Sequence, residues 1–339
     1  MLFTRKRSFS AFLVGLAVFG ALAVACGGSD ETITVYSGRS EGLIGPLIER
    51  YEKETGVTVE VRYGSTTEMA TTLLEEGSNS PADVFIAQDT GGLGAVQAAG
   101  LFATLDDDIL HRVDARWRSN DGGWVGLSGR ARVIVYNKDL ISEEELPASI
   151  ADLVDPEWRG RFGWAPANAS LQAFITAMRL VEGDEATQAW MEGIIANGAQ
   201  AYGNNLSILD AVAAGEIEFG LVNHYYLHAR LAEQGESYPD RNHYGAPGTL
   251  DAFVGVAGAG ILASSEHQDA AMKFIEFLLT DESQSYFANS TYEYPVVSTV
   301  SANADLPSLD EIQPPDIDLN DLADLEGTLA LMRAAGALQ

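Results

Sequence analysis

The chain has 339 residues, 46% of them hydrophobic, and its 49 acidic and 20 basic side chains give a formal charge of −29 at pH 7. Such an acidic, lysine-poor surface argues against nucleic acid or an anionic membrane face as a partner. It suits a cationic ligand or a saline environment, and composition alone does not separate the two. The length exceeds what one hydrophobic core usually serves, so two domains are expected.

The first 25 residues have the form of a secretory signal peptide. Basic residues 5–7 precede an apolar run over residues 11–25, shorter than the roughly 20 residues that span a bilayer. Cys26, the single cysteine, excludes an internal disulfide and resembles a bacterial lipoprotein processing site, although Ala23 stands where leucine is usual. The resemblance implies a lipid on Cys26 and a linker over residues 26–31. Ordinary signal-peptidase cleavage nearby is the alternative. Either route places the mature chain outside the membrane, at the cell surface or in the periplasm.

Strand and helix patterns alternate in the first half of the mature chain. Strands are predicted over residues 33–36, 57–63 and 84–87, and helices over residues 43–51, after Ser65, and near residues 93–99. Repeated strand–helix–strand units indicate a mostly parallel sheet with helices on its faces. Ligands of such sheets bind beyond the carboxyl ends of the strands.

The second half is less regular. A strong strand signal over residues 131–136 indicates a crossing strand between domains, and residues 252–262 form the expected return crossing. Residues 240–249 are interpreted as a polar link. Further elements are a short strand at residues 161–164 and helices over residues 171–181, 184–196, 207–214, 267–279, 282–288 and about 322–335.

Two adjacent tyrosines, Tyr225 and Tyr226, stand where a strand over residues 219–222 gives way to a helix over residues 225–234, with Asn223 as the expected cap. The positive end of the helix dipole favours a phenolate or a bound anion there. Two phenolate oxygens with a nearby anion suit a hard, highly charged cation. The alternative is that both are packing aromatics.

The order of these segments resembles the bacterial ferric-iron-binding proteins of ABC importers over nearly the whole mature chain. The resemblance is carried by Asn-His-Tyr-Tyr at residues 223–226 and by residues 33–39, 80–85, 128–133, 155–160 and 293–296. It implies an α/β, two-lobed periplasmic-binding-protein fold of type II, with mixed sheets, helices on both faces and a crossing-strand hinge. The implied lobes are residues 32–131 with about 250–290, and residues 132–249 with about 291–339.

The resemblance also implies a site. Fe(III) would lie between the lobes of a monomer, bound by Tyr225 and Tyr226 and by a synergistic anion, carbonate or phosphate, and would pass to an ABC permease. The implied anion-binding residues are Arg132, Asn168, Ala169, Ser170, Asn205 and Asn223.

The chain departs from the family at several ligand positions. Ser40 stands where some members have histidine, and Gln88 stands where they have glutamate. Other members have a tyrosine where this chain has Glu41. Glu41 and Asp89 are therefore the nearest hard-oxygen candidates for the metal, with surface or capping roles as the alternative.

Three other classes of function compete with iron binding. A polyamine- or thiamine-like cation would need aromatic faces with carboxylates, and only Trp164 is placed to supply one. A phosphate- or phosphonate-type anion would use Arg132 and the Asn168 loop, although Arg132 also suits a hinge salt bridge. His224 and His228 are interpreted as packing or surface groups. The motifs of hydrolases, metalloproteases and phosphate-loop enzymes do not occur, so no enzyme is expected.

Overall fold

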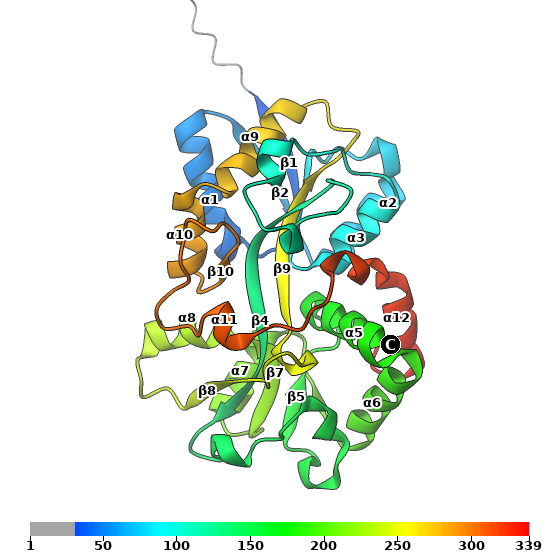
Figure 1. The fold of residues 1–339 in the computed structure, drawn as a ribbon, viewed down its shortest axis with the longest axis vertical. Coiled ribbons are helices and arrows are strands. Elements are labelled where there is room, and N and C mark those ends of the chain that lie inside the picture. The colour runs from blue at the N-terminus through cyan, green and yellow to red at the C-terminus, as the bar shows by residue number, and fades with distance from the viewer. Residues whose placement is uncertain (1–30, 339) are drawn as a thin grey trace, which may run out of the picture.

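One strand, β4 (Val125–Asn137), belongs to both halves of the structure and joins them (Figure 1). Its residues 125–131 pair with β9 (Val254–Ile261), whereas residues 132–137 pair with β7 (Phe219–Asn223) and β8 (Asp240–Tyr244). All 13 residues of β4 are buried. The fold is therefore α/β and two-lobed, with a crossing strand as its hinge, as the sequence predicts.

These observations come from a computed structural model that describes residues 31–338. The predicted signal peptide and Cys26 lie outside that range. Within it, no helix combines the length and the apolar character that crossing a membrane requires.

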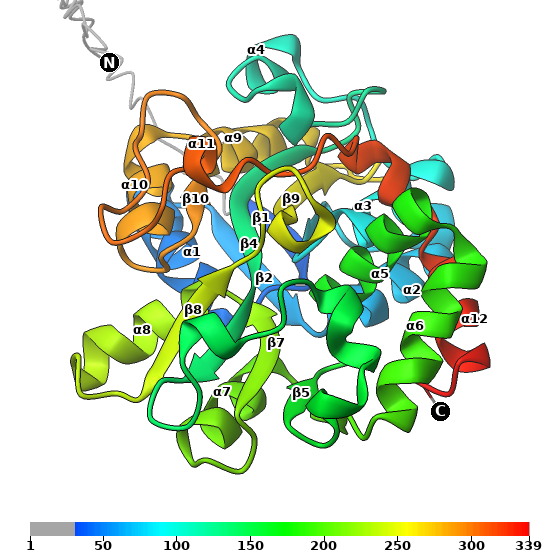
Figure 2. The same ribbon diagram turned by 60° about the horizontal axis from the view of Figure 1, so that its bottom comes forward.

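The first lobe contains a sheet in the order β2-β1-β3-β9-β4. β1 (Thr32–Ser37) is parallel to both β2 (Thr58–Tyr63) and β3 (Val84–Ala87), whereas β9 is antiparallel to β3. Helices cover both faces (Figures 1 and 2), namely α1 (Glu41–Thr55), α9 (Gln268–Leu278) and α10 (Asp281–Asn289) on one side and α2 (Thr66–Glu76) and α3 (Thr90–Ala98) on the other. The parallel order brings the carboxyl ends of β1 and β3 to one edge.

The second lobe continues the sheet in the order β4-β7-β5-β6, with β8 also paired to β4. Its short parallel strands are β5 (Phe162–Trp164) and β6 (Gln200–Ala201). Helices again lie on both sides, α5 (Ala169–Glu182) and α6 (Asp184–Ala196) opposite α7 (Asn205–Ala213) and α8 (Tyr225–Gln234). Short helices α4 (Asp107–Leu110) and α11 (Leu309–Ile312) occur in the connecting segments.

Most local predictions are confirmed, but the polar link predicted over residues 240–249 is wrong in part. Gly56 ends α1 in the left-handed conformation, at φ 77°, and Ser65 caps α2 by accepting a hydrogen bond from the Glu68 N–H. Residues 240–249, however, are not simply a polar link, because their first five residues form β8 against β4. Its side chains are mostly half-buried, so backbone pairing with a central strand overrides a polar composition.

The C-terminal segment contacts both lobes. β10 (Tyr294–Pro295) pairs with the first-lobe part of β4, and α12 (Leu325–Ala334) packs against α5 and α6 as well as α3. The lobe limits stated from the sequence stay a prediction.

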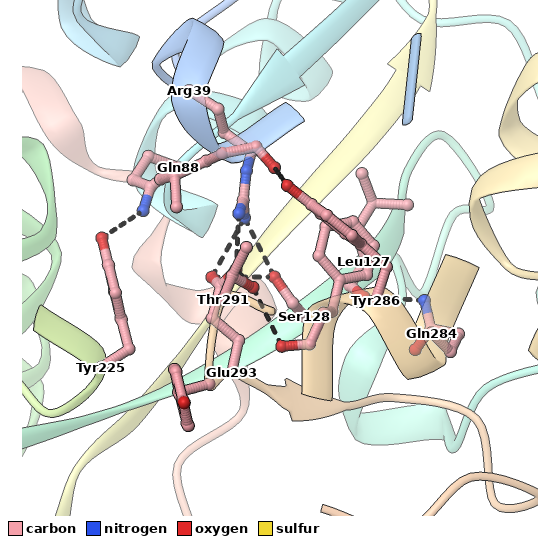
Figure 3. Close-up of polar contacts among 12 residues, drawn as sticks. Arg39, Gln88, Leu127, Ser128, Tyr225, Gln284, Tyr286, Thr291 and Glu293 are labelled. Atoms are coloured by element: carbon pink, nitrogen blue, oxygen red, sulfur yellow. Dashed lines mark hydrogen bonds and ion pairs between the residues drawn. The ribbon is translucent and has the colours of Figure 1, made fainter. Parts of the chain in front are cut away.

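A fully buried ion pair joins the turn after β1 to the C-terminal segment (Figure 3). Arg39, in the turn after β1, donates from Nη2 to Glu293 at 2.6 Å and from Nη1 to the Ser128 hydroxyl of β4 at 2.9 Å. Thr291 donates to the same carboxylate at 2.8 Å. Burial opposes the charge on Glu293, but Arg39 outweighs it and lowers the pKa of the carboxyl below its ordinary value.

Substituting Glu293→Gln leaves the buried Arg39 charge without its counter-ion. We expect the iron-free protein to lose about 3–5 kcal/mol of unfolding free energy, measured by urea titration. Glu282→Gln is the matched control, because Glu282 pairs with Arg50 at 3.1 Å while its side chain stays 74% exposed. Its effect should stay within about 0.5 kcal/mol. Equal effects of the two substitutions would contradict the role given to burial.

A second buried carboxyl, Asp240 at the start of β8, has no hydrogen-bond partner for either oxygen among residues 31–338. Burial raises its pKa to about 7, an effect that the Arg241 guanidinium offsets only in part. Between about pH 4 and pH 7 the folded state therefore holds a proton that the unfolded state releases, so stability falls as pH rises through this window.

Asp240→Asn removes that titration. We expect the variant to be more stable than the parent at pH 8, by on the order of 1–3 kcal/mol, and no more stable near pH 4. Urea titrations at the two pH values measure this. Asp139→Asn, at an exposed position, controls for the loss of one negative charge. A gain that is equal at both pH values would contradict the assignment.

Candidate functional site

Tyr225 and Tyr226 are the first two residues of α8, and only His224 separates them from the end of β7. Tyr225 is 2% exposed and Tyr226 is half-buried, and their ring centroids lie 4.2 Å apart at an interplanar angle of 31°. The junction predicted from the sequence is confirmed. The predicted cap is wrong, because His224 takes the N-cap position without a side-chain bond, whereas Asn223 ends β7.

The two phenols are not equally solvated. Burial raises the pKa of Tyr225 well above its ordinary value, and the neighbouring Tyr226 and Glu293 raise it further, whereas Arg130 lowers it. Tyr225 therefore stays a neutral phenol unless a strong cation takes the place of its proton. The site can form a phenolate only together with such a cation.

Gln88 brings the first lobe to this pair (Figure 3). It directly follows β3, and its Nε2 donates a hydrogen bond to the Tyr225 hydroxyl oxygen at 3.2 Å. Its backbone N–H donates to the Thr66 hydroxyl at 2.9 Å, which fixes the main chain at this point. The carboxyl end of β3 and the start of α8 thus meet across the lobes.

Two buried arginines on β4 lie close to the tyrosines. Arg130 and Arg132 are two residues apart and project from the same face of the strand. Arg132 donates to the Leu221 carbonyl at 3.0 Å and to the Ser170 hydroxyl at 3.5 Å, whereas Nε and Nη1 of Arg130 have no partner among residues 31–338. Burial lowers both pKa values, that of Arg132 to about 9. The guanidiniums thus favour an anion beside them.

A small cavity lies between the lobes at these arginines. It is lined from both lobes by Asp89, Thr90, Arg130, Phe253 and Gly255 and by Arg132, Ser170, Ala173 and Asn223. The space open to the centre of a water-sized sphere is about 10 Å³. That is about what one water molecule requires, so a larger anion needs the lobes to separate slightly.

The anion-binding residues expected from the resemblance are brought together in part. The Ser170 hydroxyl accepts from Asn223 at 3.1 Å, and Asn168 caps α5 by accepting from the Ser170 backbone N–H at 3.1 Å. Ala169 is buried as the first residue of the same helix. Asn205 is also fully buried, and neither polar atom of its amide has a partner within residues 31–338.

The two predicted carboxylates lie in different surroundings. Asp89 is 2% exposed, caps α3 through the Gly92 N–H at 3.2 Å and lines the cavity. Burial raises its pKa to about 6, an effect that Arg130 reduces. Glu41 begins α1 as an exposed residue and is not among the residues that line the cavity. Within residues 31–338, no three His, Cys, Asp or Glu side chains group as metal ligands.

His224 is a packing group, as interpreted from the sequence, whereas the expectation that Trp164 could face an organic cation is not met. His224 is fully buried, its Nδ1 accepts from the Ala131 N–H at 3.1 Å, and its Nε2 donates to the Tyr292 carbonyl at 2.7 Å. Burial lowers its pKa to about 3, so the ring is neutral. Trp164 is 1% exposed and stacks edge-on against Trp190, which removes it as an aromatic face for an organic cation.

The sequence interpretation gives no role to Arg130, and it names Gln88 only as a departure from the family. Arg130 could have been found, because a residue two places before Arg132 in a strand shares its face. The role of Gln88 could not, because its contact with Tyr225 depends on how the lobes approach each other.

The fold and the interlobe site define a solute-binding protein. Residues 37–285 match the family described as bacterial extracellular solute-binding protein, and the chain belongs to it. It is 34% identical over 325 residues to the Fe(3+)-binding periplasmic protein of Serratia marcescens, covering 95% of each chain. The predicted resemblance to ferric-iron-binding proteins is thereby confirmed.

Solved structures agree with this assignment. Iron-bound HitA from Pseudomonas aeruginosa superimposes with a TM-score of 0.87 at 33% identity, over 90% of this chain and 99% of that one. The Trichodesmium protein IdiA (FutA), in complex with iron and citrate ligands, gives a TM-score of 0.73 at 28% identity, over 90% and 99%.

Proposed function

We propose that this protein captures Fe(III) between its lobes through the phenolate oxygens of Tyr225 and Tyr226, together with an anion, and delivers it to an ABC permease. The observation that carries the proposal is the adjacent tyrosine pair at the start of α8, with ring centroids 4.2 Å apart, beside two buried arginines. Phenolates are hard, anionic oxygen ligands, which suit Fe(III). The printed names of the relatives, which bind ferric iron, support the choice of cargo.

The charges around the site explain why an anion accompanies the metal. Fe(III) with two phenolates keeps one positive charge, and the buried Arg130 and Arg132 add to it. An anion in the interlobe cavity offsets this excess in a region where unpaired charge is strongly disfavoured. Carbonate and phosphate are the expected anions, and the citrate in the Trichodesmium structure is a third of the same kind.

The contacts of the cavity indicate how the anion is held. Arg132, Ser170 and Asn223 already form a hydrogen-bonded group there. Arg130 lines the same cavity, and its Nε and Nη1 have no partner among residues 31–338. Asn168 orients Ser170 at the start of α5, where the helix dipole also favours negative charge. Asp89 is the carboxylate nearest to the cavity, whereas Glu41 would reach a metal only from the exposed edge of the first lobe.

The predicted signal peptide and the predicted lipid attachment at Cys26 indicate where the protein acts. Lipid attachment at Cys26 would anchor the protein to the outer side of a membrane, where a permease of the importer is reached without diffusion in bulk solution. Release as a free periplasmic monomer is the alternative. Mass spectrometry of the purified mature chain separates the two, because a lipidated Cys26 adds the mass of the acyl groups.

A colour test addresses the ligands directly. Fe(III)–phenolate bonds absorb visible light, so the protein reloaded with ferric iron and bicarbonate should be orange to purple. Tyr225→Phe and Tyr226→Phe each remove one phenolate while keeping the ring, and each should bleach the band or weaken iron binding at least tenfold, with little change in melting of the iron-free protein. Tyr286→Phe, which loses only a 3.3 Å bond to the Leu43 carbonyl, should keep the band. A colourless, iron-free wild-type product would reject the function.

The anion is tested by chelator competition in bicarbonate, phosphate and citrate. We expect iron affinity to depend on the anion supplied, and Arg132→Gln to lower affinity by about 10–100-fold, because one charge-assisted contact is lost. Arg62→Gln, at a half-exposed side chain of the first lobe, is the control. If the wild type is indifferent to the anion, protein groups complete the metal shell, with Asp89 and Glu41 first in line.

A further inference from the structure

We propose that Gln88 is a positioning residue that donates a hydrogen bond from the first lobe to the metal-ligating oxygen of Tyr225, and so couples iron ligation to lobe closure. This inference rests on the proposed function. It assigns a role to a side chain that stands where the family resemblance places a glutamate ligand.

The geometry places Gln88 for this role. β3 is buried over all four of its residues, and the Thr66 hydroxyl fixes the backbone N–H that follows it. The side chain then extends across to the second lobe, where Nε2 lies 3.2 Å from the Tyr225 hydroxyl oxygen (Figure 3). The hydrogen bond therefore spans the two lobes, and it can form only when they lie this close.

The chemistry of the amide explains why glutamine suits this position. A ligating phenolate oxygen is negatively charged, and an amide N–H stabilises that charge, whereas a carboxylate would repel it or compete for the metal. The Oε1 of Gln88 is buried and has no hydrogen-bond partner among residues 31–338, so rotation of the amide breaks no hydrogen bond on that side. Rotation by a half-turn lets the same side chain accept from the free phenol or donate to the ligated oxygen.

A second cross-lobe hydrogen bond provides the control. The Thr67 hydroxyl of α2 donates to Oε1 of Gln172 in α5 at 2.9 Å. It links the same two lobes and contacts neither tyrosine. Thr67→Val removes this hydrogen bond and keeps the shape of the side chain. It therefore measures how much a contact between the lobes slows iron release when the surroundings of the Tyr225 oxygen are unchanged.

The experiment compares iron-loaded mature wild type, Gln88→Leu, Gln88→Asn and Thr67→Val in bicarbonate. Leucine keeps the length without the amide, and asparagine keeps the amide but is one methylene short of Tyr225. We expect both Gln88 variants to shift the visible band to longer wavelength, because the oxygen lone pairs lose their stabilisation. They should also release iron to a chelator about tenfold faster. Thr67→Val should leave the band unshifted.

The outcomes distinguish a failure of the role given to Gln88 from a failure of the proposed function. A coloured wild type whose band stays unshifted in both Gln88 variants overturns the role of Gln88 and leaves the proposed function standing. If iron release becomes equally faster in Thr67→Val and in the Gln88 variants, and the visible band does not shift, the role of Gln88 is likewise overturned and the proposed function stands. A wild type without the band overturns both. If Gln88→Leu does not fold, by melting of the iron-free protein, Gln88→Asn decides.

Discussion

The burial of positive charge on the crossing strand is the constraint on which the rest of the structure depends. Arg130 and Arg132 lie on one face of β4, at 3% and 5% exposure, at the point where the strand passes from one lobe to the other. Within residues 31–338 neither makes a salt bridge, whereas the nearby Arg39 has its counter-ion in Glu293. An uncompensated guanidinium in such a place is strongly disfavoured. The region between the lobes is therefore built to receive negative charge, and phenolates and a small anion are two ways to supply it.

The order of the strands brings the polar side chains of both lobes close to these two buried arginines. The carboxyl end of β3 supplies Gln88 and Asp89, and the end of β7 supplies Asn223 and the tyrosine pair. These ends belong to different lobes, so a closed arrangement is needed for them to meet. The Arg39–Glu293 pair stabilises the first-lobe side of that arrangement, because it ties the turn after β1 to β4 and to the segment before β10. One buried ion pair thus links the packing of the first lobe to the strand that carries the two site arginines.

Much of this could be predicted from the sequence, because the relevant signals are local. The tyrosine pair falls at a change from strand to helix pattern, and α8 has the predicted limits. The predictions that failed concern features that are decided by tertiary contacts. Asparagine is a residue type that often caps helices, but the Asn223 amide donates its hydrogen bond to the Ser170 hydroxyl instead. The polar residues of β8 form a strand because β4 supplies a partner for their backbone hydrogen bonds. Glu41 and Asp89 have equivalent signals at strand ends, and only the packing of α1 and α3 makes one exposed and the other buried.

The charge of the whole protein and the charge of the site have opposite signs, and the two act over different distances. The formal charge of −29 resides mostly on exposed acids, whose field attracts cations but is screened beyond about 8–10 Å at physiological salt. Inside the lobes, where screening is weak, Arg130 and Arg132 reverse the local sign. Under the proposed function, a bare Fe(III) ion would be attracted by the surface and repelled at the site. A ferric ion that arrives with its anion meets no such reversal, since the anion contacts the guanidiniums while the metal contacts the phenolates. The arginines of β4 thereby make the pair of ions, not the metal alone, the species that fits.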